Sequence, residues 1–416
     1  MPGGGITMPE FDEALLLRAQ PSLFTDADTP LGLDEYQAFT TRTDQNARPG
    51  TEGLGFVLLG LFGEVGGLLS ALKKKQRDKD AFVAYHDAVL EELGDALWYF
   101  ANAALRADLP LSMIAQRIPA TLDSWDYHGR TGPSTFLDLQ RRTPDFEGPT
   151  ASAVLEHRLL ALAGKVGGLL DDFSSGRIQA NRDVLSADLV EIFRAMLAAA
   201  DDAEVSLDQA ARLNVAKTLG RWPVAPDWGA LFDVDFPPEE QLPRQMTMIF
   251  KERRIGDQAY VIQQLNGVNI GSRLTDNRHE PDDYRFHDVF HLAFAAVLGW
   301  SPVLRALLKL KRKSRPEIDE NEDGARAAII EEGISTWIFN QGVRNVDFRA
   351  VASLDYSLLK AVRELVRGYE VEQRPLWQWE RAILEGFRIF RELKHHRSGA
   401  VTIDLNLRTI EFKAIS

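Results

Sequence analysis

Acidic side chains on two neighbouring apolar stretches are the first candidates for chemistry in this sequence. Glu64 lies on one stretch, and Glu92 and Asp95 lie on the next. Both stretches carry apolar residues at helical spacing, and two acids three residues apart share one face of a helix. Carboxylates from two facing helices form an oxygen-only cluster, which suits Mg²⁺ when substrate phosphates supply the remaining ligands. We therefore predict a metal site of Glu64, Glu92 and Asp95.

A second candidate site lies in the last third of the chain. His287 and His291 are four residues apart, so they project from one face of a helix and could bind one metal ion. Asp288 lies between them, and Glu331 or Glu332 could add a carboxylate. Two histidines and a carboxylate with an open position suit Zn²⁺, Mn²⁺ or Fe²⁺. The alternative interpretation is a hydrogen-bonded pair of core histidines beside two glutamates on a solvated helix face.

The first cluster also carries a family resemblance. Several segments in the same order are similar to the MazG-type all-α nucleoside triphosphate pyrophosphohydrolases, namely 33–37, 59–66, 73–74 and 92–99. The resemblance covers roughly residues 30 to 115. It implies a helical bundle that hydrolyses nucleoside or deoxynucleoside triphosphates to the monophosphate and pyrophosphate with Mg²⁺, or with Mn²⁺ in its place.

The sequence departs from this family at one position. The family pattern is ExxE on one helix and ExxD on the next. Glu64, Glu92 and Asp95 match three of the four acids, whereas Gly67 stands where the family has a second Glu. Either another acid or water fills the missing place, or the site binds a nucleotide without hydrolysing it.

Further residues have candidate roles in this reaction. Glu91 lies next to the metal face and could orient or deprotonate the attacking water. Trp98 or Tyr99 could stack on the base, although aromatic residues at such positions more often belong to the core. Four cations could contact the leaving pyrophosphate, namely Lys73, Lys74, Lys217 and Arg221.

The first helical segment recurs about 100 residues later, which favours a tandem duplication. The segment 63–69 recurs as 164–170, and 92–95 recurs as 188–191 at nearly the same shift. Lys165 replaces the first acid in the second copy. Because a cation repels Mg²⁺, we expect no second magnesium site there.

The second copy ends in polar residues that the first copy lacks. Asn214, Lys217 and Arg221 share one helix face and resemble the polar tail of the family. One hypothesis is a division of labour, in which copy one supplies carboxylates for Mg²⁺ and copy two supplies donors for the triphosphate. The alternative is that copy two only replaces the packing partner of a homodimer.

We predict a mainly α fold, a tandem all-α MazG-like bundle followed by an α+β domain. Strands are expected in 246–274 and in 400–415, because both segments alternate and turn residues divide the first, and long helices are expected between them. The predicted organisation is a leader (1–50), repeat 1 (51–125), a connector (126–150), a degenerate repeat 2 (151–225), a linker (226–243) and a C-terminal domain with the HDxxH helix (244–416).

Charge and cysteine content indicate which cell compartment and which binding partners to expect. The chain has 416 residues, a net charge of −13 and no cysteine. Such a charge argues against nonspecific binding of nucleic acid, and the run of five cations from Lys309 to Arg315 is typical of a solvated helix end. We find neither a signal peptide nor an apolar run of about 20 residues, so we expect a cytoplasmic protein with no membrane partner. We expect a small nucleotide as the partner, and the sequence is compatible with either a monomer or a homo-oligomer.

Two other functions compete with hydrolysis in the first unit. The duplicated unit could be an impaired nucleotide-sensing module that regulates a metal-binding C-terminal effector domain, which could itself be a hydrolase. Alternatively, the only chemistry lies in the HDxxH domain and the helical pair is a scaffold.

Overall fold

The structure is a computed structural model in which the chain forms two compact units, Met1–Ala225 and Pro226–Ser416. The first part of the expected leader and most of the expected connector lie outside the described residues. The structure describes residues 30–45, 47–48, 50–118, 134–140, 151–180, 182–223 and 225–415.

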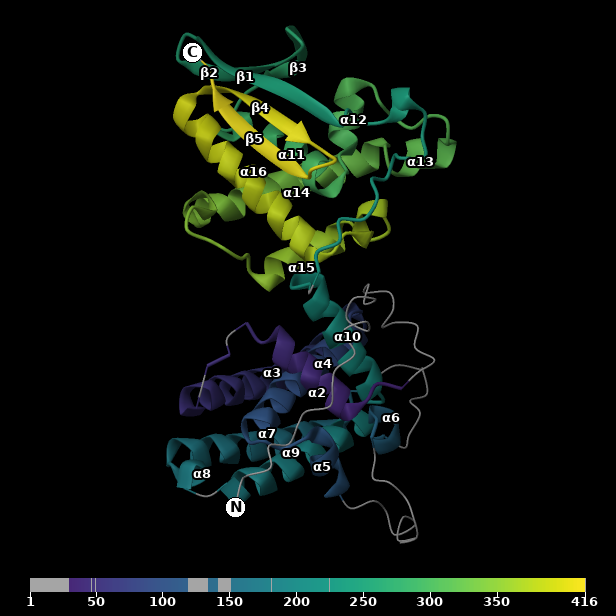
Figure 1. Ribbon diagram of the computed structural model, residues 1–416, viewed down its shortest axis with the longest axis vertical. Helices are drawn as coiled ribbons and strands as arrows, with labels where there is room; N and C mark the ends of the chain where they lie inside the picture. Colours follow the sequence, from purple (N-terminus) through teal and green to yellow (C-terminus); the bar gives the residue numbers. More distant parts are fainter. Residues whose placement is uncertain are drawn as a thin grey trace, which may run out of the picture. The chain divides into compact units, whose positions relative to one another are not determined.

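The N-terminal unit is built from helices (Figure 1). Their apolar stripes form one continuous core, in which α3 contacts α4 and α7, α7 contacts α9, and α4 contacts α10. The helices are α2 (Leu33–Thr43), α3 (Gly50–Asp78), α4 (Tyr85–Arg106), α5 (Leu111–Gln116), α6 (Phe136–Leu139), α7 (Ala153–Ser174), α8 (Arg177–Ala180), α9 (Arg182–Asp202) and α10 (Leu207–Arg221).

Helix α2 lies inside this unit, although its residues were expected to belong to a leader ending at residue 50. Leu33 and Tyr36 are fully buried. The side-chain amide of Gln37 donates to the carbonyl oxygens of Ala101 (3.2 Å) and Leu109 (3.0 Å). The bundle therefore begins before residue 51, and α2 joins α4 to the turn that precedes α5.

One segment of this unit, residues 50–81, is long and apolar enough to cross a membrane by length and composition. This segment was not predicted from the sequence, because glycines and Glu64 interrupt its apolar residues. About a third (33%) of its most apolar window is buried inside the bundle, including Val57, Leu61 and Val65. Two C-terminal helices, 284–298 and 302–308, pass the same test only as a pair bent by 107°.

The C-terminal unit contains one antiparallel sheet with the strand order β3-β2-β1-β4-β5. The last two strands pair onto the first three as the alternating sequence predicted, with Met248 opposite Val401. Both of these side chains are buried on the face that packs on helices. The strands are β1 (Gln245–Ile255), β2 (Gln258–Leu265), β3 (Val268–Leu274), β4 (Ser398–Asp404) and β5 (Thr409–Ala414).

Helices α11 and α16 pack on each other and contact β4 and β5 (Figure 1). Helix α11 is apolar on nearly every side, so it lies at the centre of the unit, where Phe290 stacks near Phe387 and Phe390. The helices of this unit are α11 (Asp288–Leu298), α12 (Pro302–Leu308), α13 (Pro316–Asn321), α14 (Ala325–Arg344), α15 (Tyr356–Leu365) and α16 (Leu376–His396).

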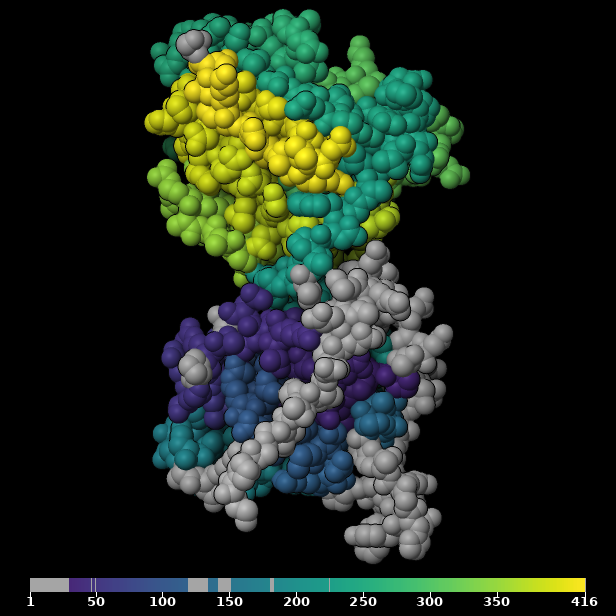
Figure 2. Space-filling view, viewed as in Figure 1, coloured from purple at the N-terminus to yellow at the C-terminus, as the bar shows by residue number. Residues whose placement is uncertain are grey.

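The stretch 226–243, expected to be a linker, packs into the C-terminal unit instead. The guanidinium of Arg374 donates to the carbonyl oxygens of Trp228 (2.6 Å) and Ala230 (2.5 Å). Leu231 and Leu242 are buried in the same core as α11. Figure 2 shows this teal stretch lying against the yellow C-terminal elements of the unit. Its proline-rich composition therefore marks an irregular path over the unit and not a free connection.

Candidate functional site

The carboxylates predicted as metal ligands meet where α3 packs on α4. Glu64 of α3 and Glu92 of α4 are half-buried, and their carboxyl groups share a hydrogen bond. Asp95 lies one turn further along α4, and its charge acts on both. The structure therefore brings the three acids to one place between the two helices.

These acids repel one another, because burial keeps water from screening them. Burial, the charge of Asp95 and the contact with Glu92 raise the pKa of Glu64 to about 8. Burial also raises the pKa of Glu92. Glu64 thus carries a proton at neutral pH. A divalent cation would relieve the repulsion as this proton does, and the all-oxygen donor set fits Mg²⁺.

Gly67 lies one turn after Glu64 and faces Glu92. A Cβ atom at this position would overlap with the carboxylate of Glu92. The fourth position of the acidic pattern is therefore directed into the site, as the spacing on α3 predicts. Because Gly67 has no side chain, the carboxylate of Glu92 can lie directly against α3.

Helix α10 contributes the donors to the same place. Asn214 donates from Nδ2 to Oδ1 of Asp95 (2.9 Å), and its own oxygen accepts from the Tyr36 hydroxyl (3.1 Å). Lys217 forms ion pairs with Oε1 of Glu91 (3.3 Å) and with Asp95. Two residues predicted as phosphate donors thus contact two predicted acids across more than a hundred residues of chain.

The lysines at the end of α3 lie away from this cluster. Lys73 and Lys74 are exposed. They follow Glu64 by nine and ten residues, which corresponds to about 14 Å along a helix, and Lys73 lies half a turn away from the face of Glu64. As placed here, they contact none of the acids, so their proposed role needs a long substrate or a movement of their side chains.

The aromatic candidates pack between helices. Trp98 donates from Nε1 to the hydroxyl of Thr43 (3.0 Å), and the Tyr99 ring lies against Gly60 of α3. Both are half-buried, in agreement with a core role. Arg221, at the end of α10, lies 4.7 Å from the centre of the Trp222 ring.

The positions on α7 and α9 that the predicted duplication would align with these acids carry charges of both signs. Lys165 forms an ion pair with Glu191 (3.1 Å). Asp188 has a buried Oδ2 without a hydrogen bond, and burial raises its pKa. These residues line a cleft of about 290 Å³ together with Arg177 and the Asp171–Asp172 pair. The Lys165 ammonium lies in this cleft among the acids, and the absence of magnesium there stays a prediction.

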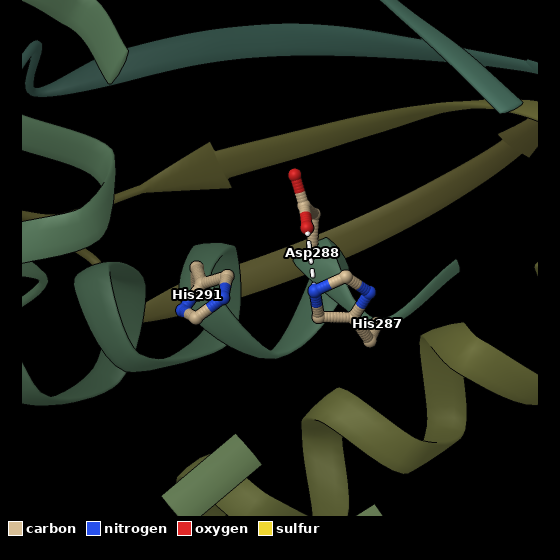
Figure 3. A group of neighbouring side chains, drawn as sticks. All are labelled: His287, Asp288 and His291. Carbon is tan, nitrogen blue, oxygen red and sulfur yellow. Dashed lines mark ion pairs between the residues drawn. The ribbon is translucent and has the colours of Figure 1, made fainter. Parts of the chain in front are cut away.

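The C-terminal histidines lie at the start of α11, and Figure 3 shows them with Asp288. The Nδ1 atom of His287 lies 2.9 Å from the carbonyl oxygen of Tyr284, whose ring stacks on the imidazole. The Nδ1 atom of His291 lies 2.8 Å from Glu331. Both rings are therefore held through Nδ1, which leaves both Nε2 atoms on the side of Asp288.

The two glutamates of α14 have different environments. Glu331 is fully buried, and it accepts from the Ser301 hydroxyl (2.7 Å) and the Val303 amide (2.8 Å) as well as facing His291. Glu332 reaches the surface and lies 3.7 Å from His287 Nε2 and 3.4 Å from His291 Nε2. Glu331 therefore orients an imidazole, whereas Glu332 faces the same space as the two Nε2 atoms.

Charges in this cluster compensate one another. Against the effect of burial, the charge of Glu331 holds the pKa of His291 well above its usual value. Against the effect of burial, the contacts with the His287 and His291 imidazoles hold the pKa of Glu332 well below its usual value. Asp288 lies 3.1 Å from His287 Nε2 and accepts from the Gln263 amide (2.6 Å).

The two clusters differ in how tightly they converge. One ligand atom from each of His287, Asp288 and His291 lies within 4.8 Å of the others. In the described part of the chain, the acids of α3 and α4 do not meet this distance as a group of three. Asn214 and Lys217 hold Asp95, so binding of a cation there needs a small rearrangement.

The raised pKa of Glu64 predicts how stability depends on pH. The usual value is 4.5, so the folded state binds more protons than the unfolded state between about pH 5 and pH 8. The free energy of unfolding of the metal-free protein should therefore fall over this range. Mg²⁺ should raise the melting temperature more at pH 8.5 than at pH 6, because at pH 6 the cation must displace a proton. Thermal unfolding with and without Mg²⁺ measures both effects.

Glu64→Gln is the control for this dependence, because it keeps the shape and removes the titration. It should flatten the fall in stability and abolish the stabilisation by Mg²⁺. Equal stabilisation of the unaltered protein by Mg²⁺ at both pH values would contradict the assignment.

Comparison with known proteins shows which family the C-terminal unit is similar to. Residues 228–416 match the family described as the MazG C-terminal domain, which supports a MazG-related protein and suggests a nucleotide-related function. The chain is also 43% identical over 68 residues to the Gene 37 protein of Mycobacterium phage L5, which covers 16% of this chain and 60% of that protein. The match thus spans less than two thirds of that relative. No solved structure matches the chain.

Proposed function

We propose that this MazG-related chain hydrolyses nucleoside or deoxynucleoside triphosphates to the monophosphate and pyrophosphate at the junction of α3, α4 and α10. The contact of Asn214 and Lys217 with the acids of α4 carries the proposal. It joins the acidic residues that suit Mg²⁺ and the donors that suit phosphate in one site. The resemblance of both sets of residues to MazG-type pyrophosphohydrolases points to the same reaction.

Each residue of this site would have its own role in hydrolysis. Glu64, Glu92 and Asp95 would hold Mg²⁺, or Mn²⁺ in its place, which neutralises charge on the phosphate chain. Glu91 lies at the edge of this group and would orient or deprotonate the attacking water. Lys217 would leave its carboxylates and contact the leaving pyrophosphate when substrate enters.

The packing of the helices supports the duplication as part of the proposal. α3 with α4 and α7 with α9 form two similar pairs, and the helix after each pair packs on the other pair, α5 on α9 and α10 on α4. Such an exchange makes each copy depend on its neighbour. Copy two, with Lys165 paired to Glu191, would then serve copy one by supplying α10.

A specific observation favours a second candidate function. Gly67 leaves the site one acid short, and Glu92 lies against the space where that acid would begin. The site would have only three metal ligands, and the third, Asp95, is paired with Lys217. Such a site could bind a nucleotide without turnover. The N-terminal unit would then sense nucleotides and regulate the C-terminal unit.

A panel of nucleoside and deoxynucleoside triphosphates tests the proposal. The full-length chain with Mg²⁺ should release monophosphate and pyrophosphate in equal amounts from at least one of them. Mg²⁺-dependent binding without products favours the sensing module. Absence of both binding and products would reject both functions.

Lys217→Met should affect binding and turnover in opposite directions. Removal of the cation takes away one of the two groups that hold Asp95, and Asn214 remains, so Mg²⁺ should bind more tightly. Turnover should fall by roughly 10²-fold, the usual cost of losing one group that stabilises the transition state. Mn²⁺ binding and kcat, measured on the same protein, check the two effects. Lys165→Met, the cation of copy two, is the matched control and should change neither.

A further inference from the structure

We propose that the C-terminal unit binds one divalent transition-metal ion, of the class of Zn²⁺, through Nε2 of His287, Nε2 of His291 and a carboxylate oxygen of Asp288. Glu332 would face the exposed side of this ion. The proposal concerns the C-terminal unit alone and does not depend on hydrolysis in the N-terminal unit.

The side chains are already close enough for a metal site. Their ligand atoms lie within 4.8 Å of one another, whereas two ligands on one Zn²⁺ at about 2.0–2.2 Å lie at most about 4.4 Å apart. Small rotations of these side chains are therefore sufficient. Both histidines come from one end of α11, whose buried position fixes the backbone that carries them.

An independent observation points to a missing ligand. The Nε2 atom of His291 is buried, since only 2% of this residue is exposed, and it makes no well-formed hydrogen bond. Its contact with Glu332 is an ion pair at 3.4 Å. Buried polar atoms are normally satisfied. This atom is directed into the group formed with His287 and Asp288 (Figure 3), where a metal ion would satisfy it.

The surroundings of the histidines match those of metal ligands. A ligating imidazole normally donates its other N–H to a carboxylate or a carbonyl oxygen, which fixes the ring and the tautomer. The Nδ1 atom of His291 faces the buried carboxylate of Glu331 (2.8 Å), and that of His287 faces a backbone carbonyl (2.9 Å). Glu331 is itself held by Ser301 and the Val303 amide. It is therefore a positioning residue.

The donor set selects the class of metal and leaves room for a ligand. Two imidazoles favour Zn²⁺ and similar first-row ions over Mg²⁺ and Ca²⁺, which prefer oxygen. The side chain of Glu332 is 43% exposed, so the site reaches the surface on this side. Three protein ligands and an accessible fourth position are typical of zinc sites that bind water or an anionic ligand.

Metal uptake by the full-length chain tests the proposal. Chelator-treated protein without an affinity tag is supplied with Zn²⁺ or Co²⁺ in the presence of excess Mg²⁺, which occupies oxygen-only sites. We expect one Zn²⁺ per chain by elemental analysis and the visible absorption of a four- or five-coordinate Co²⁺ ion. His287→Ala and Asp288→Asn should lose both signals. His279→Ala, which alters an exposed histidine of the same unit, should keep both.

A further variant distinguishes a metal site from a buried cluster that is held together by ion pairs alone. Glu331→Gln keeps a hydrogen bond to His291 but lowers its basicity, so it should weaken Zn²⁺ binding by about 10- to 100-fold and leave the stoichiometry at one. The proposal is overturned if folded protein takes up no Zn²⁺, or if His287→Ala binds it as tightly as the unaltered chain. Circular dichroism of each variant shows that it is folded.

Discussion

Replacement of Glu92 by Gln should reduce Mg²⁺-dependent pyrophosphate release by about 10²-fold or more, the scale expected when a group that stabilises transition-state charge is lost. Glu92 contacts Glu64 and lies against Gly67, so it is central to the acidic cluster. The neutral amide has the same shape, and the helices should pack unchanged. It binds Mg²⁺ poorly and adds no negative charge to the site. Initial rates with the best substrate of the panel measure the loss.

Asp188→Asn is the matched control for this prediction. Under the predicted duplication Asp188 of α9 would correspond to Glu92, and it lines a cleft with Lys165. Its replacement should leave pyrophosphate release unchanged within about twofold, because no magnesium is expected there. Full activity of Glu92→Gln would show that any hydrolysis occurs elsewhere in the chain.

Arg312→Met should strongly destabilise the C-terminal unit. The Arg312 guanidinium, 1% exposed, donates to Asp323 (2.7 Å) and Glu370 (2.7 Å). Removal of the cation leaves Glu370 without this ion pair and leaves Asp323 with only the Arg312 amide and the more distant Arg305; breaking a buried ion pair typically costs about 3–5 kcal/mol. For a unit of this size the loss corresponds to a fall in melting temperature on the order of 10 °C. Calorimetry of the full-length chain measures it.

Lys313→Met is the control for the buried ion pairs. Lys313 is the next residue, and its side chain is exposed. Surface substitutions of this kind usually change stability by less than about 0.5 kcal/mol. If both variants melt together with the unaltered protein, the ion pairs of Arg312 contribute nothing to stability.

Regular local patterns predicted much of the C-terminal unit. The turn residues Gly256 and Gly267 separate three alternating segments, and these became β1, β2 and β3. Alternation at the end of the chain likewise predicted β4 and β5 and their pairing onto this sheet. Spacing along one helix also placed His287 and His291 on one side of α11. In each case, the information lies within a few residues.

Contacts between distant segments were harder to predict. Arg312 lies in a run of cations that resembles a solvated helix end, yet its partners Asp323 and Glu370 come from later segments and bury it. The stretch 226–243 is rich in proline, and its burial depends on Arg374 from far along the chain. Leu33 and Tyr36 are buried because α4 and α10 cover them. The composition of a segment does not indicate which distant residues contact it.

In the candidate sites too, local patterns were predicted and contacts between distant segments were missed. The acids on α3 and α4 were predicted from their spacing and from a family resemblance, and Lys217 was assigned to the same site as a donor. Its ion pairs with Glu91 and Asp95 depend on how α10 packs on α4. Tyr36, which orients Asn214, and Gln263, which donates to Asp288, were missed. Tyr36 lies in a polar stretch and Gln263 beside a second glutamine, so neither residue type nor spacing indicates such a contact.

Binding of a non-hydrolysable triphosphate analogue tests the central claim most directly, because it does not require turnover. Calorimetric titration of the full-length chain should show one analogue bound per chain with Mg²⁺ and much weaker binding without it. Glu64→Gln should lose the Mg²⁺-dependent part. Binding that is equally tight without Mg²⁺, or that Glu64→Gln leaves unchanged, would contradict a metal–nucleotide site between α3 and α4.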